Sequence, residues 1–297
     1  MLNYLIDTHI HGAFGINFNQ ANYDEFKFVL SELFKRNIKG ICPTLVGDCD
    51  DKIYEQLKLI KQIRLEQLKN RDNEALILGV HLEGTFLSPE KSGIQDKNVF
   101  KKPAVDNFKT LVRDCEDIIK IVTVAPEENI DLIGYLNERK IITQAGHSAG
   151  DNLSDCIGVT HLFNAMKSIH HRDNSIALQA LINDSIYVEV IGDLIHLSSD
   201  ILKLILKTKQ KEKILLISDS LPSANYDKDI IFCNRKINKD GKDEFGTLAG
   251  SNKTLDEICE NLIEKEILTQ KDIELMGFKN QIKYLNLSKV EIDILNG

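Results

Sequence analysis

The stretch YLIDTHIHG, residues 4–12, indicates the fold of this 297-residue chain. It is a short apolar run that ends in two histidines and a glycine. Similar runs recur as ALILGVHLEG (75–84), KIITQAGHSAG (140–150), GVTHLFNAM (158–166) and YVEVIGDLIHLS (187–198). Histidine is a common side-chain ligand of transition metals. Histidines at the ends of successive strand-like runs therefore predict one shared metal site.

Strand-like runs alternate with amphipathic, helix-like segments along most of the chain. We predict strands at 4–11, 38–46, 75–82, 118–125, 140–146, 158–163, 186–192 and 214–218. Predicted helices occupy 22–36, 50–70, 103–116, 129–139, 174–183 and 198–209, with a further helix near 253–265. Continuous apolar strands that alternate with helices are typical of a parallel sheet.

Eight strand–helix units within about 250 residues match the size of a (β/α)₈ barrel, or TIM barrel. The alternative, a doubly wound open sheet, typically has a glycine-rich phosphate loop after its first strand. The first turn here reads HIHGAFG (9–15) and does not fit. We therefore expect a single α/β catalytic domain over 1–297, with the TIM barrel at about 4–267 and a polar, helical C-terminal tail at 268–297.

Composition excludes several classes of function. A net charge of −8 argues against a nucleic-acid binder. No apolar run approaches the ~20 residues of a membrane helix. Asp7 and His9 lie where a signal peptide would be apolar, so we expect a cytoplasmic protein without a membrane partner. The six cysteines contain no CxxC pair, which argues against disulfides or a thiolate zinc site.

The strand ends supply candidate metal ligands. His9 and His11 are two residues apart on a strand, so both side chains point to one face and can reach one ion. Glu83, His147 and His161 end the third, fifth and sixth predicted strands. Together they form a two-histidine, one-carboxylate set that leaves coordination positions for water and substrate. His81, two residues before Glu83, either orients a ligand or caps its strand.

Other polar residues near strand ends are candidates for catalysis and substrate binding. Asp219 ends the eighth strand, where a carboxylate can move a proton from metal-bound water to a leaving group, rather than only cap a turn. His196, at the end of the seventh strand, is a candidate to bond a substrate oxygen. Arg172, in HHR at 170–172, belongs either to a solvated loop or to a phosphate-binding grip.

The motifs taken together resemble a known family. They are DTHIHG (7–12), HLEGTFLSPEKSG (81–93), TVAPE (123–127), GHSAG (146–150), THLFNAM (160–166), HHR (170–172), SDS (218–220) and GTLAGS (246–251). This set resembles the N-acetylglucosamine-6-phosphate deacetylases of the amidohydrolase superfamily, over about residues 7–265. The resemblance implies a metal-dependent barrel that hydrolyses N-acetylglucosamine 6-phosphate to glucosamine 6-phosphate and acetate.

The same resemblance implies cofactors and partners. We expect one or two divalent ions, zinc first, with iron, manganese or cobalt also acceptable to such ligands. We also expect a homodimer in which the neighbouring subunit lends part of the phosphate site.

Roles follow from the resemblance residue by residue. It implies that Glu83, His147 and His161 hold the main metal, and that His9 and His11 hold the second metal that some members bind. Asp219 matches the catalytic aspartate and His196 a histidine that touches the substrate. The implied substrate-binding residues are Ile94, Gln95, Asn164, Ala165, His171, Arg172, Leu248, Ala249 and Gly250.

The sequence departs from the family pattern in three places. Thr85 stands where the family usually has proline, a change we expect a turn to tolerate. Ile94 and Gln95 replace a small residue and a histidine that contacts the sugar, which leaves the exact substrate open. The family's accessory β-sandwich is expected to be missing.

Two alternative functions remain open. One is a related amidohydrolase that acts on another N-acylated sugar or on a cyclic amide. The cyclic-amide enzymes often use a lysine at the fourth strand end, where this chain reads TVAPE, and Lys120 lies at the start of that strand. The other is a non-catalytic barrel that binds a sugar phosphate.

Overall fold

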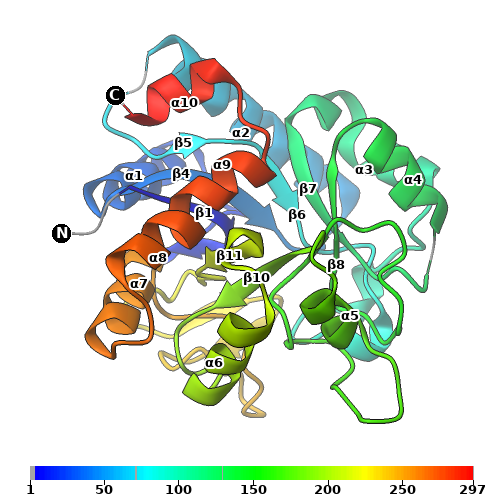
Figure 1. Cartoon of the computed structure of the whole chain (residues 1–297). Helices are drawn as coiled ribbons and strands as arrows, with labels where there is room; N and C mark the ends of the chain where they lie inside the picture. Colours follow the sequence, from blue (N-terminus) through cyan, green and yellow to red (C-terminus); the bar gives the residue numbers. More distant parts are fainter. Residues whose placement is uncertain (1–3, 71, 129, 297) are drawn as a thin grey trace.

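The computed structural model describes residues 4–70, 72–128 and 130–296. Within these residues a nearly closed barrel of parallel strands confirms the predicted TIM barrel (Figure 1). Its strands, in order of pairing, are β1 (Leu5–Ile10), β4 (Ile38–Leu45), β6 (Val80–Leu82), β7 (Ile119–Val124), β8 (Ile142–Ala145), β9 (Gly158–Val159), β10 (Tyr187–Ile191) and β11 (Ile214–Ile217). A short strand, β5 (Leu76–Ile77), also pairs with β4.

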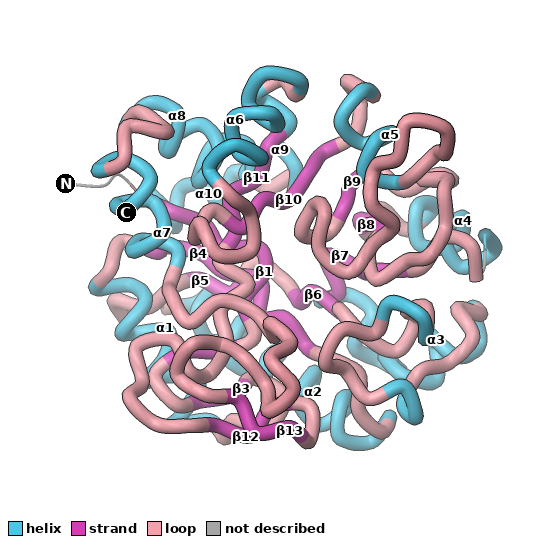
Figure 2. Tube along the Cα trace, turned by 90° about the horizontal axis from the view of Figure 1, so that it is seen from below, coloured by secondary structure: helices cyan, strands magenta, loops and turns pink. Residues whose placement is uncertain are grey.

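Helices surround the ring of strands, as Figure 2 shows. Their apolar sides face inward; α1, for example, buries Phe26, Val29, Leu30 and Leu33. The helices that follow the strands are α1 (Tyr23–Lys35), α2 (Asp50–Lys69), α3 (Val105–Val112), α4 (Ile130–Glu138), α5 (Ile176–Ile182), α6 (Ser199–Thr208) and α7 (Leu255–Glu264).

The barrel closes where the first strand meets the last. His11 N donates a hydrogen bond to Ser220 O and Asp219 N donates to His9 O, both at 2.9 Å. The Asp7 carboxylate accepts bonds from the Ser218 amide and hydroxyl. Asp7 is fully buried, and burial raises its pKa to about 7 in spite of these bonds. Closure brings β1 and the segment after β11 together, although they are far apart in sequence.

The predicted elements differ from the structure where the chain changes direction. The predicted strand 75–82 is interrupted at Gly79, whose φ is +141° and where a Cβ would lie 2.6 Å from the Cβ of Lys120. The sixth strand ends at Val159 rather than at 163, because the chain turns before His161. The helix predicted at 103–116 ends at Val112, since Arg113 has a left-handed φ of 49° and a 3₁₀ helix follows.

Two small antiparallel pairs were not predicted. One joins β2 (Gly12–Ala13) to β3 (Ile16–Asn17) directly after the first barrel strand. The other joins β12 (Ile230–Phe232) to β13 (Arg235–Ile237) after the last barrel strand. The ring centroid of Phe232 lies 5.4 Å from that of His11, so this second hairpin covers part of the barrel mouth.

The C-terminal segment is part of the core and not a polar appendage. It forms α8 (Gln270–Glu274), α9 (Asn280–Tyr284) and α10 (Lys289–Asn296), which lie over the N-terminal ends of the strands (Figure 1). Asn280 Nδ2 donates to Ile214 O at 2.7 Å, and Gln281 Nε2 donates to Leu216 O at 3.1 Å. No helix among the described residues is long and apolar enough to span a membrane.

We expect Tyr284 to contribute strongly to stability. Its hydroxyl accepts a bond from Gln144 Nε2 at 3.2 Å, and a Cβ at Gly158 would lie 2.1 Å from it. Tyr284→Ala should lower the free energy of unfolding by about 3–5 kcal/mol, as for other buried rings. Tyr284→Phe, which keeps the ring, should cost about 1 kcal/mol. Urea unfolding of both variants measures the difference, and equal losses would contradict the packing role.

Candidate metal centre and active site

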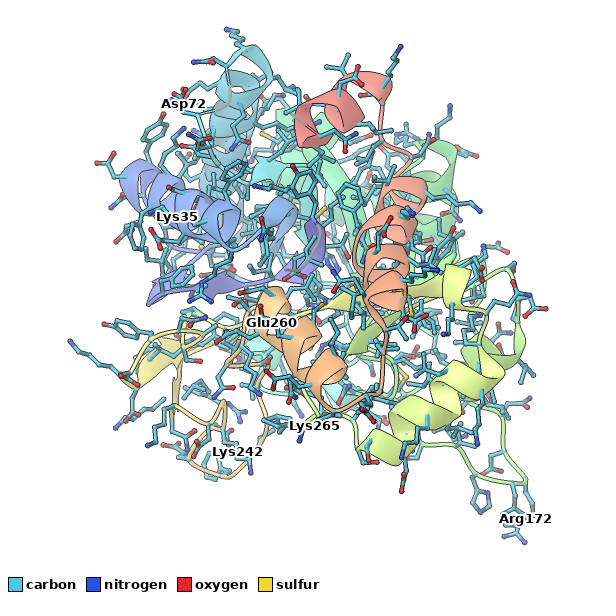
Figure 3. The ribbon with its side chains drawn as sticks, turned by 60° about the vertical axis from the view of Figure 1, so that its left-hand side comes forward. Lys35, Asp72, Arg172, Lys242, Glu260 and Lys265 are labelled. Carbon is cyan, nitrogen blue, oxygen red and sulfur yellow. The ribbon has the colours of Figure 1, made fainter. Side chains whose placement is uncertain are left out.

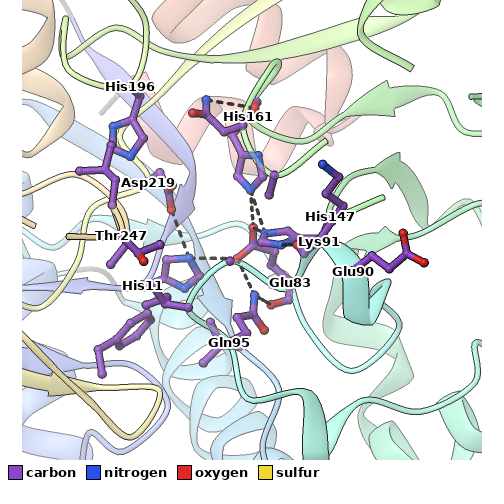
Figure 4. Close-up of a pocket in the computed structure, with 18 residues that line it drawn as sticks. His11, Glu83, Glu90, Lys91, Gln95, His147, His161, His196, Asp219 and Thr247 are labelled. Carbon is purple, nitrogen blue, oxygen red and sulfur yellow. Dashed lines mark hydrogen bonds and ion pairs between the residues drawn. The ribbon is translucent and has the colours of Figure 1, made fainter. Parts of the chain in front are cut away.

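Three predicted ligands from three different strands meet at the mouth of the barrel (Figure 4). Glu83 Oε1 lies 3.1 Å from His147 Nε2 and 2.8 Å from His161 Nε2. The two imidazole nitrogens are 3.1 Å apart. Neighbouring ligands of a tetrahedral zinc ion are separated by roughly 3.3 Å. This buried donor set therefore fits one divalent ion.

A second donor set adjoins the first. His9 Nε2 and His11 Nε2 are 3.3 Å apart, and His11 Nε2 lies 3.2 Å from Glu83 Oε2. Asp219 Oδ1 lies 3.4 Å from His9 Nε2 and 3.2 Å from His11 Nε2. Glu83 thus offers one oxygen to each set, as a carboxylate that bridges two ions would. The residues fit a second divalent ion next to the first.

Most of the imidazoles are held through the nitrogen that faces away from the centre. His147 Nδ1 donates to Lys91 O at 2.7 Å, and His11 Nδ1 donates to Thr44 O at 3.2 Å. A carbonyl oxygen only accepts, so each Nδ1 carries the proton and Nε2 is directed to the centre. His161 differs, because its buried Nδ1 has no hydrogen-bond partner.

The backbone is strained at three of these positions. His147, His161 and Asp219 each follow a barrel strand and have φ values of 46°, 30° and 51°. The left-handed region costs a non-glycine residue about 1–3 kcal/mol, and such residues cluster at active sites. The turn at each strand end carries the side chain to the pocket, where all three line the wall.

The buried carboxylates control the charge of the histidines. Burial alone would lower the pKa of His9, but Glu83, Glu189 and Asp219 outweigh it and hold that pKa well above its ordinary value. Burial would raise the pKa of Glu83, but the charge of His9 and other imidazoles holds it well below its usual range. Glu83 is therefore ionised, and the site is suited to a cation.

A pocket of about 290 Å³ opens above the donor sets. It brings together most of the predicted substrate-binding residues with several that the sequence did not single out. The predicted members are Ile94, Gln95, Asn164, Ala165, His196, Leu248 and Ala249, and the additional ones include Lys91, Phe232 and Thr247.

His196 lies near Asp219 in the pocket (Figure 4), and a carboxylate holds its ring. His196 Nδ1 lies 2.8 Å from Asp193 Oδ2, and Asp193 Oδ1 accepts from the backbone amides of Ile195 and His196. Because Asp193 contacts Nδ1, the Nε2 atom of His196 is available to form a hydrogen bond with a substrate.

The departures from the family pattern lie beside Glu83. Gln95 Nε2 donates to Glu83 O at 3.0 Å and lies 3.4 Å from Glu83 Oε2. Gln95 therefore contacts the carboxylate that faces both donor sets. Thr85 has a φ of 74°, a value that a proline ring cannot adopt. The backbone at residue 85 thus differs from the one a proline would impose.

Three predicted substrate-binding residues are not brought into this pocket. His171 and Arg172 are exposed, and Figure 3 shows Arg172 on a loop that projects from the body of the chain. Gly250 is buried against the strand end, where a Cβ would lie 2.8 Å from Asp219 O.

His81 lies below the centre and has partners at both nitrogens. Its Nε2 is 2.8 Å from Thr123 Oγ1 and its Nδ1 is 3.3 Å from Thr8 O. Burial, together with the charge of His9, lowers its pKa to about 3, so the ring is neutral. Its ring packs edge-on against that of His9, with centroids 4.6 Å apart, a contact that fits the predicted role of orienting a ligand.

Glu189, which bonds His9, is not among the residues predicted from the sequence. It lies inside β10 with no exposed surface. A single charged residue within an otherwise apolar buried strand is unusual, and this signal in YVEVI could have identified it.

Comparisons with known proteins agree with the fold. No family model matches the chain. It is 30% identical over 304 residues to an N-acetylglucosamine-6-phosphate deacetylase of Bacillus subtilis, covering 97% of this chain and 76% of that protein. It is 25% identical to an N-acetylgalactosamine-6-phosphate deacetylase of Escherichia coli, over 87% of this chain and 71% of the relative.

A solved structure is similar over nearly the whole chain. The crystal structure of N-acetylglucosamine-6-phosphate deacetylase from Thermotoga maritima superimposes with a TM-score of 0.85 at 26% identity, covering 96% of this chain and 78% of that one. With the barrel, the donor sets and near-complete coverage by the Bacillus relative in agreement, the chain belongs to the N-acetylglucosamine-6-phosphate deacetylase family.

Proposed function

We propose that this protein removes the N-acetyl group of N-acetylglucosamine 6-phosphate, giving glucosamine 6-phosphate and acetate. The observation that carries the proposal is the meeting of Glu83, His147 and His161 in one pocket that Asp219 also lines. The similarity to the Bacillus subtilis deacetylase supports the choice of substrate.

Two divalent ions would occupy the adjoining donor sets, and zinc is the first candidate. Glu83, His147 and His161 would hold one ion, while His9, His11 and Asp219 would hold the other with Glu83. A bound divalent ion lowers the pKa of water to about 7 and polarises an amide carbonyl.

The protein's own groups would move the proton and hold the substrate. Asp219 would accept a proton as water attacks the amide and would pass it to the departing nitrogen, which is too basic to leave as an anion. His196, fixed by Asp193, would donate a hydrogen bond to the oxygen that gains negative charge. Leu248 and Ala249 line the pocket and would pack against the acetyl group.

The phosphate would be bound at the open side of the pocket. Asn164 and Ala165 line the pocket. Lys91, which is also among the described lining residues, offers a positive charge to the phosphate. Arg172 and His171 would reach the pocket of a second subunit from their exposed loop, so we propose a homodimer with shared phosphate sites.

N-acetylgalactosamine 6-phosphate is a second candidate substrate. Gln95 replaces the histidine that contacts the sugar in the family, and a deacetylase for this epimer is among the relatives. The contact of Gln95 with Glu83 places this change next to the reacting groups.

Asp219→Asn tests the proton-transfer role. Acetate release should fall about 10²–10⁴-fold, the usual contribution of a general acid–base group. The ion held by Glu83, His147 and His161 should remain, and elemental analysis can verify it. Asp200→Asn, an exposed carboxylate on α6, serves as the control. Near-normal turnover in Asp219→Asn would refute the role.

A substrate panel tests the proposed specificity. N-acetylglucosamine 6-phosphate should be hydrolysed with a kcat/KM about 10–100-fold above that of N-acetylglucosamine, because charge-assisted bonds to phosphate contribute about 1.5–3 kcal/mol. Faster hydrolysis of the galactosamine epimer would favour the second candidate, and Gln95→His should then shift the preference back. Absence of acetate release from every compound would favour a non-catalytic barrel.

Complementation tests the shared phosphate site. Arg172→Ala and Asp219→Asn homodimers should each be weak, whereas mixed dimers should regain activity. In a mixed dimer one pocket would combine an intact Asp219 with Arg172 of the other subunit. Acetate release after co-expression with two affinity tags measures this. Mixed dimers no more active than either parent would contradict the shared site.

A further inference from the structure

Glu189 connects three strands directly beneath the donor sets. Its Oε2 lies 2.9 Å from His9 Nδ1 on β1, and the amide of His161, which follows β9, donates to the same oxygen at 3.3 Å. Its Oε1 accepts from Gln144 Nε2 on β8 at 3.0 Å. Both oxygens are thus occupied by the chain, and the side chain has no exposed surface.

Burial of a carboxylate in a protein core is energetically unfavourable. Removing an ionised carboxylate from water costs several kcal/mol, and an apolar residue of similar size often serves the fold equally well. Two of the groups that bond Glu189, the His161 amide and Gln144 Nε2, are neutral. Its charge is directed at one imidazole, that of His9.

His9 is held differently from the other imidazoles of the two donor sets. His11 and His147 donate their Nδ1 protons to main-chain carbonyl oxygens, and His161 Nδ1 has no partner. Among these four, only His9 directs its Nδ1 atom at a carboxylate. A carboxylate at this position fixes the ring and makes the opposite nitrogen a stronger donor to a metal.

A third metal site formed by His9, His81 and Glu189 is not supported, although donor atoms of these residues lie within 4.8 Å of one another. Both nitrogens of His81 already have partners in the chain, Thr123 Oγ1 and Thr8 O. Glu189 is therefore a partner of His9 and not a ligand.

We infer that Glu189 is a positioning residue for the second divalent ion, the one assigned to His9, His11, Glu83 and Asp219. In this arrangement the carboxylate determines whether the chain binds two ions or only the one held by Glu83, His147 and His161. The inference rests on the proposed function only in requiring that the donor sets bind divalent metal.

Metal titration of Glu189→Gln tests this role. The metal-free wild type, prepared by chelation, should bind two equivalents of Zn²⁺ in isothermal titration calorimetry. In Glu189→Gln, whose side chain is nearly isosteric, the second equivalent should weaken about 10–100-fold, the usual effect of losing such a partner. Glu189→Leu should weaken it further, while the first equivalent changes by less than about threefold in either variant. Co²⁺ absorption spectra provide an independent count of filled sites.

Asp193→Asn is the matched control. It alters another carboxylate that contacts the Nδ1 atom of an imidazole, but that imidazole, His196, belongs to neither donor set. Both equivalents should therefore bind as in the wild type.

Several outcomes would overturn the inference. They are a single equivalent in the wild type, wild-type affinity for both equivalents in Glu189→Gln, equal weakening of the two, or loss of folding in Glu189→Gln. Loss of folding would mean that the carboxylate supports the core instead. Acetate release is measured separately, so a wild type that binds metal without hydrolysing any sugar refutes the proposed function and leaves the metal result standing.

Discussion

Contact between the first strand and the residues that follow the last strand is the constraint on which the site depends. Eight strands place their C-terminal ends around one mouth only if β1 and β11 meet, and the Asp7–Ser218 contact lies in that seam. Once the seam is closed, His9 and His11 face Asp219 across it. Without closure these residues would lie at opposite edges of an open sheet.

A polar layer inside the barrel separates this site from the apolar cluster that the C-terminal helices form with the starts of the strands. Thr123 Oγ1 lies 2.7 Å from Thr160 Oγ1, which donates to Gln144 Oε1 at 2.8 Å. Gln144 in turn donates to Glu189 and to Tyr284 of the C-terminal segment. Buried polar groups are costly unless their bonds are made. This network satisfies those groups and connects the C-terminal helices to the residues beneath the ligands.

The site concentrates features that do not favour folding by themselves. Carboxylates and imidazoles are buried together, and three residues at strand ends occupy left-handed backbone conformations. Packing of the surrounding strands and helices offsets this unfavourable free energy. In return the donor atoms are held close together by rigid strand ends, which is the property that a metal-dependent hydrolase requires.

Local patterns in the sequence determined the barrel and most of the candidate ligands, and tertiary contacts decided the rest. Alternation of apolar strands with amphipathic helices is a local property, and the two-residue spacing of His9 and His11 fixes their common face. The role of Glu189 could not be read in this way, because it depends on which side chain of another strand lies opposite. The docking of the polar C-terminal tail onto the barrel is likewise set by contacts between distant segments. Periodicity reports which residues are buried, but only the closed barrel determines which of them touch.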